Sequence, residues 1–289
     1  MFKTILVPTS GSSTDEVVFA VALAVSRCFE AHLQFVHVHL SPAAAALQVP
    51  HFEFCQGQAI NATLEALRNE GKHLASSARQ HFEQFCSLNE VRIRETPDSV
   101  GGITASLIEE VDKPVARLVS HARHSDLIVL GRRHRDHLPR GLIESVLVGG
   151  GRPIIIAHDA PPRNLTGTIV VGWKETPEAA RALAAALPLL KQAQRVVLLG
   201  IAEEQAPARA AYEDVARQLA WHGIDAEITI VGGNGSFPAA TMLPQAATQL
   251  RADLLVVGGF GRTPVRELVF GGVTQSLINS ASFPVFILH

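Results

Sequence analysis

Short runs of Val, Ile and Leu recur along the chain and predict buried strands. Nearly every position in each run is apolar, which is typical of parallel strands that helices cover on both faces. The runs come in similar pairs: KTILVPT at 3–9 with GTIVVGW at 167–173, SDLIVLG at 125–131 with ADLLVVG at 252–258, and RPIIIAH at 152–158 with FPVFILH at 283–289. Self-similarity on this scale predicts two domains of one kind.

Signals for the start of a helix follow the first strand of each unit. Ser13 and Glu16 have the spacing of a capping box. Thr176 can cap a second helix, in which Pro177 suits the first position and Glu178 favours the positive end. Strands that alternate with helices predict an α/β fold with a doubly wound parallel sheet in each unit. Ligands bind such sheets at the carboxyl ends of the strands, where the winding reverses.

The two units differ in length. The first pair of strands is offset by 164 residues (3 to 167) and the second pair by 127 (125 to 252), so the first unit has about 37 extra residues. We place them at about 41–78, between LQFVHVHL (33–40) and a third strand VRIRE (91–95), as a loop and an extended helix. The predicted domains are 1–158 and 168–289, and the paired prolines within 159–167 indicate a linker.

Glycines cluster after the strand at 252–258. Gly258 is followed by Gly261 and, after nine residues, by Gly271 and Gly272, which precede a predicted helix that contains Thr274. Glycine lets the backbone turn and approach a ligand closely, and the N–H groups at a helix start attract anions. Together these features predict a cradle for phosphates.

The spacing G-x2-G-x9-G, the short helix and final strand after it, and ILVPTSGS at 5–12 resemble the universal stress protein family in its tandem form, over the whole chain. The resemblance implies a stress-response protein of two five-stranded, Rossmann-like domains of the adenine nucleotide α-hydrolase-like class. Family members pair through their final strands, so it implies an intramolecular pseudo-dimer and allows a homodimer. It also implies ATP, with Mg accompanying it, at a second-domain site made of Gly172, Trp173, Lys174, Ile201, Gly258, Gly261, Arg262, Gly271, Gly272, Val273 and Thr274.

The chain departs from the family pattern at positions that contact the nucleotide. The residue after the third glycine is Gly272 instead of Ser or Thr, and the nucleoside-binding Asp is replaced by Ser10 in the first unit and Lys174 in the second. In the first unit His134 takes the place of the second glycine, and Glu144-Ser145 replaces the third glycine and its neighbour. A carboxylate there repels a polyphosphate. We therefore expect ATP only in the second unit.

Other functions find less support in the sequence. No G-x-S-x-G elbow is present, no paired carboxylates flank a plausible cleft, and PTSGSSTDE at 8–16 lacks the Walker lysine, so we expect a non-catalytic sensor or interaction module. A slow ATPase, or a scaffold that has lost nucleotide binding in both units, remains an alternative. The net charge of −2, with scattered Lys and Arg, argues against nucleic acid and an anionic membrane. No signal peptide or spanning run is evident, so we expect a cytoplasmic protein.

Two short segments suggest other ligands. HFEFC places His51 and Cys55 where they could form half a zinc site, but no second cluster completes it, and a loop that packs its phenylalanines is the simpler interpretation. RRHRDHLPR at 132–140 could bind an acidic ligand, although such a run is more often a solvated loop. We expect no metal ion.

Overall fold

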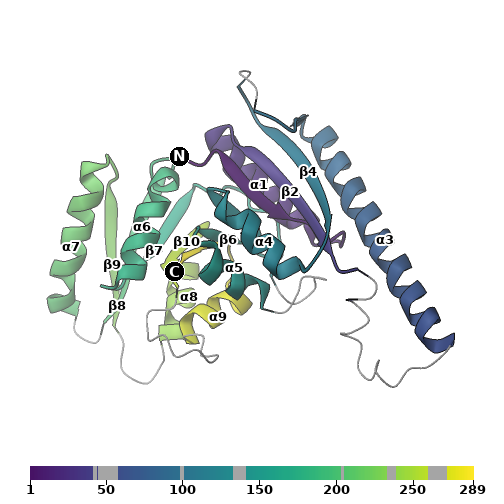
Figure 1. The fold of residues 1–289 in the computed structure, drawn as a ribbon. Helices are drawn as coiled ribbons and strands as arrows, with labels where there is room; N and C mark the ends of the chain where they lie inside the picture. Colours follow the sequence, from purple (N-terminus) through teal and green to yellow (C-terminus); the bar gives the residue numbers. More distant parts are fainter. Residues whose placement is uncertain are drawn as a thin grey trace.

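The two halves of the chain form one continuous sheet in the computed structural model, with helices on both faces (Figure 1). The structure describes residues 1–41, 44, 58–97, 101–132, 141–202, 205–232, 239–259 and 272–289. Within these residues the sheet has 11 strands in the order β3-β4-β2-β1-β5-β6-β11-β10-β7-β8-β9.

The first half contains six strands of this sheet. Its elements are β1 (Thr4–Pro8), α1 (Asp15–Phe29), β2 (His32–His39), α3 (Gln58–Leu88), β3 (Arg92–Ile93), β4 (Thr104–Val111), α4 (Pro114–Arg123), β5 (Leu127–Leu130), α5 (Leu142–Gly150) and β6 (Ile154–Ile156).

The second half contributes the other five strands. Its elements are β7 (Thr168–Gly172), α6 (Pro177–Leu190), β8 (Arg195–Ala202), α7 (Gln205–Trp221), β9 (Ala226–Gly232), α8 (Ala239–Gln249), β10 (Leu254–Gly258), α9 (Gly272–Ser280) and β11 (Val285–Leu288). None of the described helices is both long enough and apolar enough to cross a membrane.

Helices cover the sheet in two layers, as the continuous apolar strands predict. On one face the core contains side chains of α1, α3, α6 and α7, and on the other face those of α4, α5, α8 and α9. The six paired runs all form strands, and the α/β, doubly wound class is confirmed. Neighbouring strands are parallel within each half. The halves meet where β6 and β11 pair antiparallel, with Ile155 opposite Phe286.

The segment VRIRE, predicted as the third strand over 91–95, forms only a two-residue strand. Only Arg92 and Ile93 are in a strand, and that strand pairs with β4 at the edge of the sheet. The strand beside β2 is β4, whose sequence TASLIEEV includes Glu109 and Glu110. Because β4 carries charged residues and is only partly buried, it lacks the apolar run that marks a central strand.

Helix α3 lies between β2 and β4 in the chain, as α7 lies between β8 and β9 in the second half, and it is longer than the 17-residue α7. It has 31 residues and packs on β2, β4 and α1, where Phe82 and Phe85 contact Phe19 and Phe35. Figure 1 shows α3 running along the outer side of β4. The segment 45–57 that precedes it, including HFEFC, lies outside the described residues.

Candidate functional site

The predicted site of the second half lies at the carboxyl ends of β7 and β10. These strands are neighbours, and Gly172 is paired in register with Val257, so Gly172 and Gly258 lie close together at this edge. Helix α9 begins at Gly272, and Thr274 is buried in its first turn. Gly261, Arg262 and Gly271 lie outside the described residues, so their positions stay a prediction.

Gly258 has a packing role that the sequence did not indicate. A Cβ atom at this position would lie 2.5 Å from the backbone nitrogen of Ala179, in the first turn of α6. The end of β10 therefore packs directly against the start of α6, with no room for a side chain. This glycine brings strand and helix together whether or not a phosphate binds.

The start of α6 is stabilised by its own residues, as predicted. The Thr176 hydroxyl accepts a hydrogen bond from the Ala179 N–H at 3.3 Å, and Pro177 occupies the first turn. The pKa of Glu178 is lowered, first by a hydrogen bond from its own backbone N–H and further by Thr176 and Arg181. Lys174, just before this helix, is exposed.

Tyr212 of α7 lies at the same edge and was not predicted as a site residue. A Cβ atom on Gly200 of β8 would overlap the Tyr212 ring, so the ring lies against the strand backbone at this point. The Tyr212 hydroxyl donates a hydrogen bond to the Trp173 carbonyl at 3.0 Å, and burial raises the pKa of the phenol. Tyr212 thus borders the end of the site where Trp173 and Ile201 lie. A glycine near a strand end, opposite a tyrosine on the next helix, was the available signal.

In the first half, the loop after β1 is held by Asp15. Its buried carboxylate accepts hydrogen bonds from the Thr9 hydroxyl at 2.6 Å, from the Ser10 N–H and hydroxyl at 2.9 and 2.8 Å, and from the Gly11 N–H at 2.8 Å. The predicted capping box of Ser13 and Glu16 is wrong: α1 starts at Asp15, and the Thr14 N-cap makes no side-chain cap hydrogen bond. The Asp15 carboxylate instead binds the preceding loop.

Helix α3 covers this loop. Gly11 has a φ of +75°, and a Cβ atom there would overlap the backbone carbonyl of Leu74 in α3. His81 of α3 lies 3.4 Å from the Asp15 carboxylate. Helix α3 therefore occupies space beside the loop that contains Ser10.

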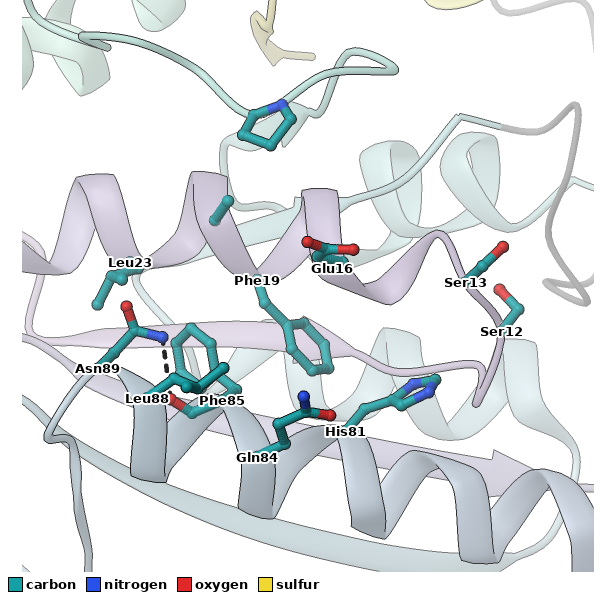
Figure 2. A pocket seen from close by; sticks show the side chains of 12 residues that line it. Ser12, Ser13, Glu16, Phe19, Leu23, His81, Gln84, Phe85, Leu88 and Asn89 are labelled. Carbon is teal, nitrogen blue, oxygen red and sulfur yellow. Dashed lines mark hydrogen bonds between the residues drawn. The ribbon is translucent and has the colours of Figure 1, made fainter.

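A groove of about 480 Å³ runs between α1 and α3 (Figure 2). Phe19 and Phe85 meet at its floor with ring centroids 5.4 Å apart. Ser12, Ser13, Glu16, His81, Gln84 and Asn89 give it a polar rim, and Pro161 of the linker contributes to its lining. The side-chain amide of Asn89 donates a hydrogen bond to the Phe85 carbonyl of α3 at 2.9 Å, which fixes Asn89 against the end of this helix.

The degenerate glycine segment of the first half leads into α5. Gly141 is the N-cap with a φ of +75°, and Glu144 lies in the first turn. A carboxylate there offsets the positive end of the helix. By contrast, the first turn of α9 contains no acidic residue. Arg132 donates to the carbonyl of Ala281, which links the halves, and burial lowers its pKa; His134 and the rest of 133–140 lie outside the described residues.

The described part of the chain contains no group of three or more His, Cys, Asp or Glu side chains that could hold a metal ion. Cys28 and Cys86 are free thiols, and burial raises the pKa of Cys86 to about 11. Burial therefore suppresses the thiolate form of Cys86, which is the form that binds metals.

These features define a tandem, doubly wound α/β protein with a candidate ligand edge in each half. The family model described as "Universal stress protein family" matches residues 1–148 and 166–289, and the chain belongs to this family.

The solved structures that resemble the chain over nearly its full length include the following two. One is a universal stress protein from Archaeoglobus fulgidus DSM 4304, with a TM-score of 0.69, 17% identity and coverage of 99% of this chain and 97% of that one. The other is a functionally unknown protein from Pseudomonas aeruginosa PAO1, with a TM-score of 0.57, 14% identity and coverage of 99% and 92%. At this identity they show the fold alone. The comparison with curated proteins found no match.

Proposed function

We propose that this protein is a nucleotide-sensing module of the stress response, and that its second half binds an adenine nucleotide without rapid turnover. The observation that carries the choice of the second half is the contrast between the two helix starts. The first turn of α9 begins with Gly272 and has no acidic residue, whereas α5 has Glu144 in its first turn. A helix start without a carboxylate attracts phosphate.

The fit of a nucleotide differs between the halves. In the first half, α3 packs on Gly11, and Asp15 accepts hydrogen bonds from the loop N–H groups. In the second half we assign Trp173, Lys174 and Ile201 to the nucleoside end of the site, next to Tyr212, whose hydroxyl donates to the Trp173 carbonyl. The phosphates would be held by Gly272, Val273 and Thr274 at the start of α9, and by Gly261, Arg262 and Gly271. Mg would accompany the triphosphate.

Isothermal titration calorimetry with ATP and Mg tests this proposal. We expect one binding site per chain, and at least a tenfold weaker affinity when Gly261→Val and Gly271→Val are combined, because the added side chains block the approach of the phosphates. Gly71→Ala in α3 is a suitable control, since its Cβ atom would make only an ordinary contact with His39, 3.7 Å away.

Two results would contradict the proposal: no heat of binding in the native protein, or an unchanged affinity in the double glycine variant. Heating the purified protein and analysing the supernatant for released nucleotide gives an independent answer. Following phosphate production from ATP by the unheated protein distinguishes a sensor from a slow ATPase.

A scaffold is the second candidate function, and the groove between α1 and α3 favours it. This groove has an apolar floor and a polar rim, as binding surfaces commonly do. In this case both halves would lack nucleotide. We also propose that β6 and β11 make the chain an intramolecular pseudo-dimer, in the way that two single-domain chains would pair.

A further inference from the structure

A polar patch on one face of the sheet, in the first half of the chain, lies outside both candidate nucleotide edges. His32 and Gln34 of β2 are paired in register with Thr104 and Ser106 of β4. Residues on this face of central parallel strands are normally apolar, because helices cover them. Here α4 packs on β2 and β1, and these four polar side chains line a cavity of about 770 Å³ toward the amino ends of the strands.

The imidazole of His32 joins the two hydroxyl groups of β4. Its Nδ1 lies 2.8 Å from Thr104 Oγ1 and its Nε2 lies 3.0 Å from Ser106 Oγ. If Nδ1 donates its hydrogen to Thr104, Nε2 is the acceptor for the hydroxyl hydrogen of Ser106. A nucleophile that is hydrogen-bonded to a base, with the base oriented by a third group, is the arrangement that activates serine for covalent catalysis.

The surroundings of the pair suit a base. Burial lowers the pKa of His32, so the imidazole is neutral and able to accept a proton at neutral pH. Glu30 and Glu95 line the cavity, while the ammonium of Lys3 is engaged with the Phe29 carbonyl at 2.8 Å. Two carboxylates disfavour an anionic substrate and allow an uncharged or cationic one.

We propose that Ser106 is a nucleophile that accepts the acyl group of small, uncharged esters, with His32 as its general base and Thr104 as a positioning residue. Ser106 Oγ bonds to the ester carbonyl carbon as its proton passes to His32 Nε2. The bond from that carbon to the alcohol oxygen then breaks, and His32 returns the proton to the leaving alcohol. Water, activated by the same imidazole, hydrolyses the acyl-serine and releases the acid.

Gln34 completes the assignment. It is the register partner of Ser106 and lines the same cavity, so its side-chain amide is the donor that we assign to the carbonyl oxygen as negative charge develops on it. The base, His32, is oriented by the hydroxyl group of Thr104, whereas a catalytic triad uses a carboxylate for this role. We therefore expect acylation to be faster than in water but slow for an esterase.

Reaction of the full-length protein with p-nitrophenyl acetate tests the proposal. We expect a burst of p-nitrophenol and, by mass spectrometry of peptides, one acetyl group on the peptide that contains Ser106. His32→Gln should slow acetylation of this peptide by at least about 100-fold, the usual contribution of a general base. Thr104→Val should slow it as well, and Thr104→Ser should restore it, because serine keeps the hydroxyl group that orients the ring.

His124→Gln is the matched control. His124 is exposed, and its ring is hydrogen-bonded to the Ser120 carbonyl of α4, away from β2 and β4. It should leave the labelling of Ser106 unchanged. The proposal is overturned if the native protein is not acetylated at Ser106, or if His32→Gln is acetylated at the native rate. Circular dichroism of each variant verifies its fold. The labelling of native Ser106 tests the proposal even if a variant fails to fold.

Discussion

Single glycines in this chain have different physical roles, although they look alike in the sequence. Gly258 belongs to the predicted phosphate motif, yet its position against α6 already requires the lack of a side chain. Gly11 combines a positive φ with the backbone of α3 beside it. A glycine at a strand end therefore indicates close approach of backbone, and only its neighbours show whether the partner is a ligand or a helix.

Replacing Gly258 by Ala should lower the free energy of unfolding by about 1–3 kcal/mol, because strand or helix must shift to admit the methyl group. Gly71→Ala should instead stabilise the protein by up to about 1 kcal/mol, since alanine favours a helix interior and has room there. Urea denaturation of both variants measures the difference. Equal stabilities would show that the end of β10 is not in tight contact with α6.

His32 should make the protein less stable in mild acid. Its pKa is lowered by burial, so the unfolded chain binds a proton at a higher pH than the folded chain does. The stabilising contribution of neutral His32 is therefore present above about pH 6.5 and decreases as the pH falls through the window down to the lowered folded pKa.

The stability difference between native protein and His32→Gln isolates this effect from the other histidines. We expect the native protein to lose stability relative to the variant as the pH falls below about 6.5, the pKa of an ordinary histidine, because burial lowers the pKa of His32 in the folded protein. Chemical denaturation at several pH values measures it. A difference that stays constant with pH would mean that His32 titrates normally in the folded protein.

At the scale of elements, α3 makes the two halves unequal. It packs on the loop after β1, and His81 reaches the Asp15 carboxylate that holds this loop. Side-chain changes at the degenerate motif are therefore only part of the difference between the halves. We propose that the helix also excludes a nucleoside from the loop after β1, because it packs against Gly11.

Restoring the family residues in the first half should consequently fail to restore binding. We expect a Ser10→Asp, Glu144→Gly variant to bind ATP with the same stoichiometry as the native protein, because α3 still lies against Gly11. Calorimetry with ATP and Mg gives the number of sites per chain. One additional site in the variant would show that α3 does not block the first half.

At the scale of the whole molecule, the antiparallel pairing of β6 and β11 joins the halves into one sheet. Ile155 and Phe286, which face each other across this junction, are both fully buried. Two halves that share an apolar junction of this kind within one sheet should unfold together.

We expect a single calorimetric unfolding transition for the native protein. Phe286→Ala should destabilise it by about 3–5 kcal/mol, the usual cost of deleting a buried aromatic ring. It should also separate the unfolding of the two halves. Differential scanning calorimetry measures both, and two resolved transitions in the native protein would contradict the coupling.

Strands with continuous apolar runs could be predicted from the sequence, because burial on both faces leaves no polar position. The β7 and β10 segments show this. The start of α6 could also be predicted, because Thr176 and Pro177 are local signals for the first turn of a helix. Strand β4 was missed because half of its residues are polar or charged. The cap at Ser13 was wrong because α1 starts at Asp15, whose carboxylate accepts hydrogen bonds from the loop just before it, at Thr9, Ser10 and Gly11.

The sequence by itself determined the duplicated α/β architecture and the family, since both follow from local patterns repeated at regular spacing. Only the tertiary structure decided which residues share a site. His32 meets Ser106 across 74 positions of chain, Tyr212 lies against Gly200, and α3 lies on Gly11. These contacts depend on how strands pair and how helices pack, and no periodicity in the sequence records a contact between distant segments.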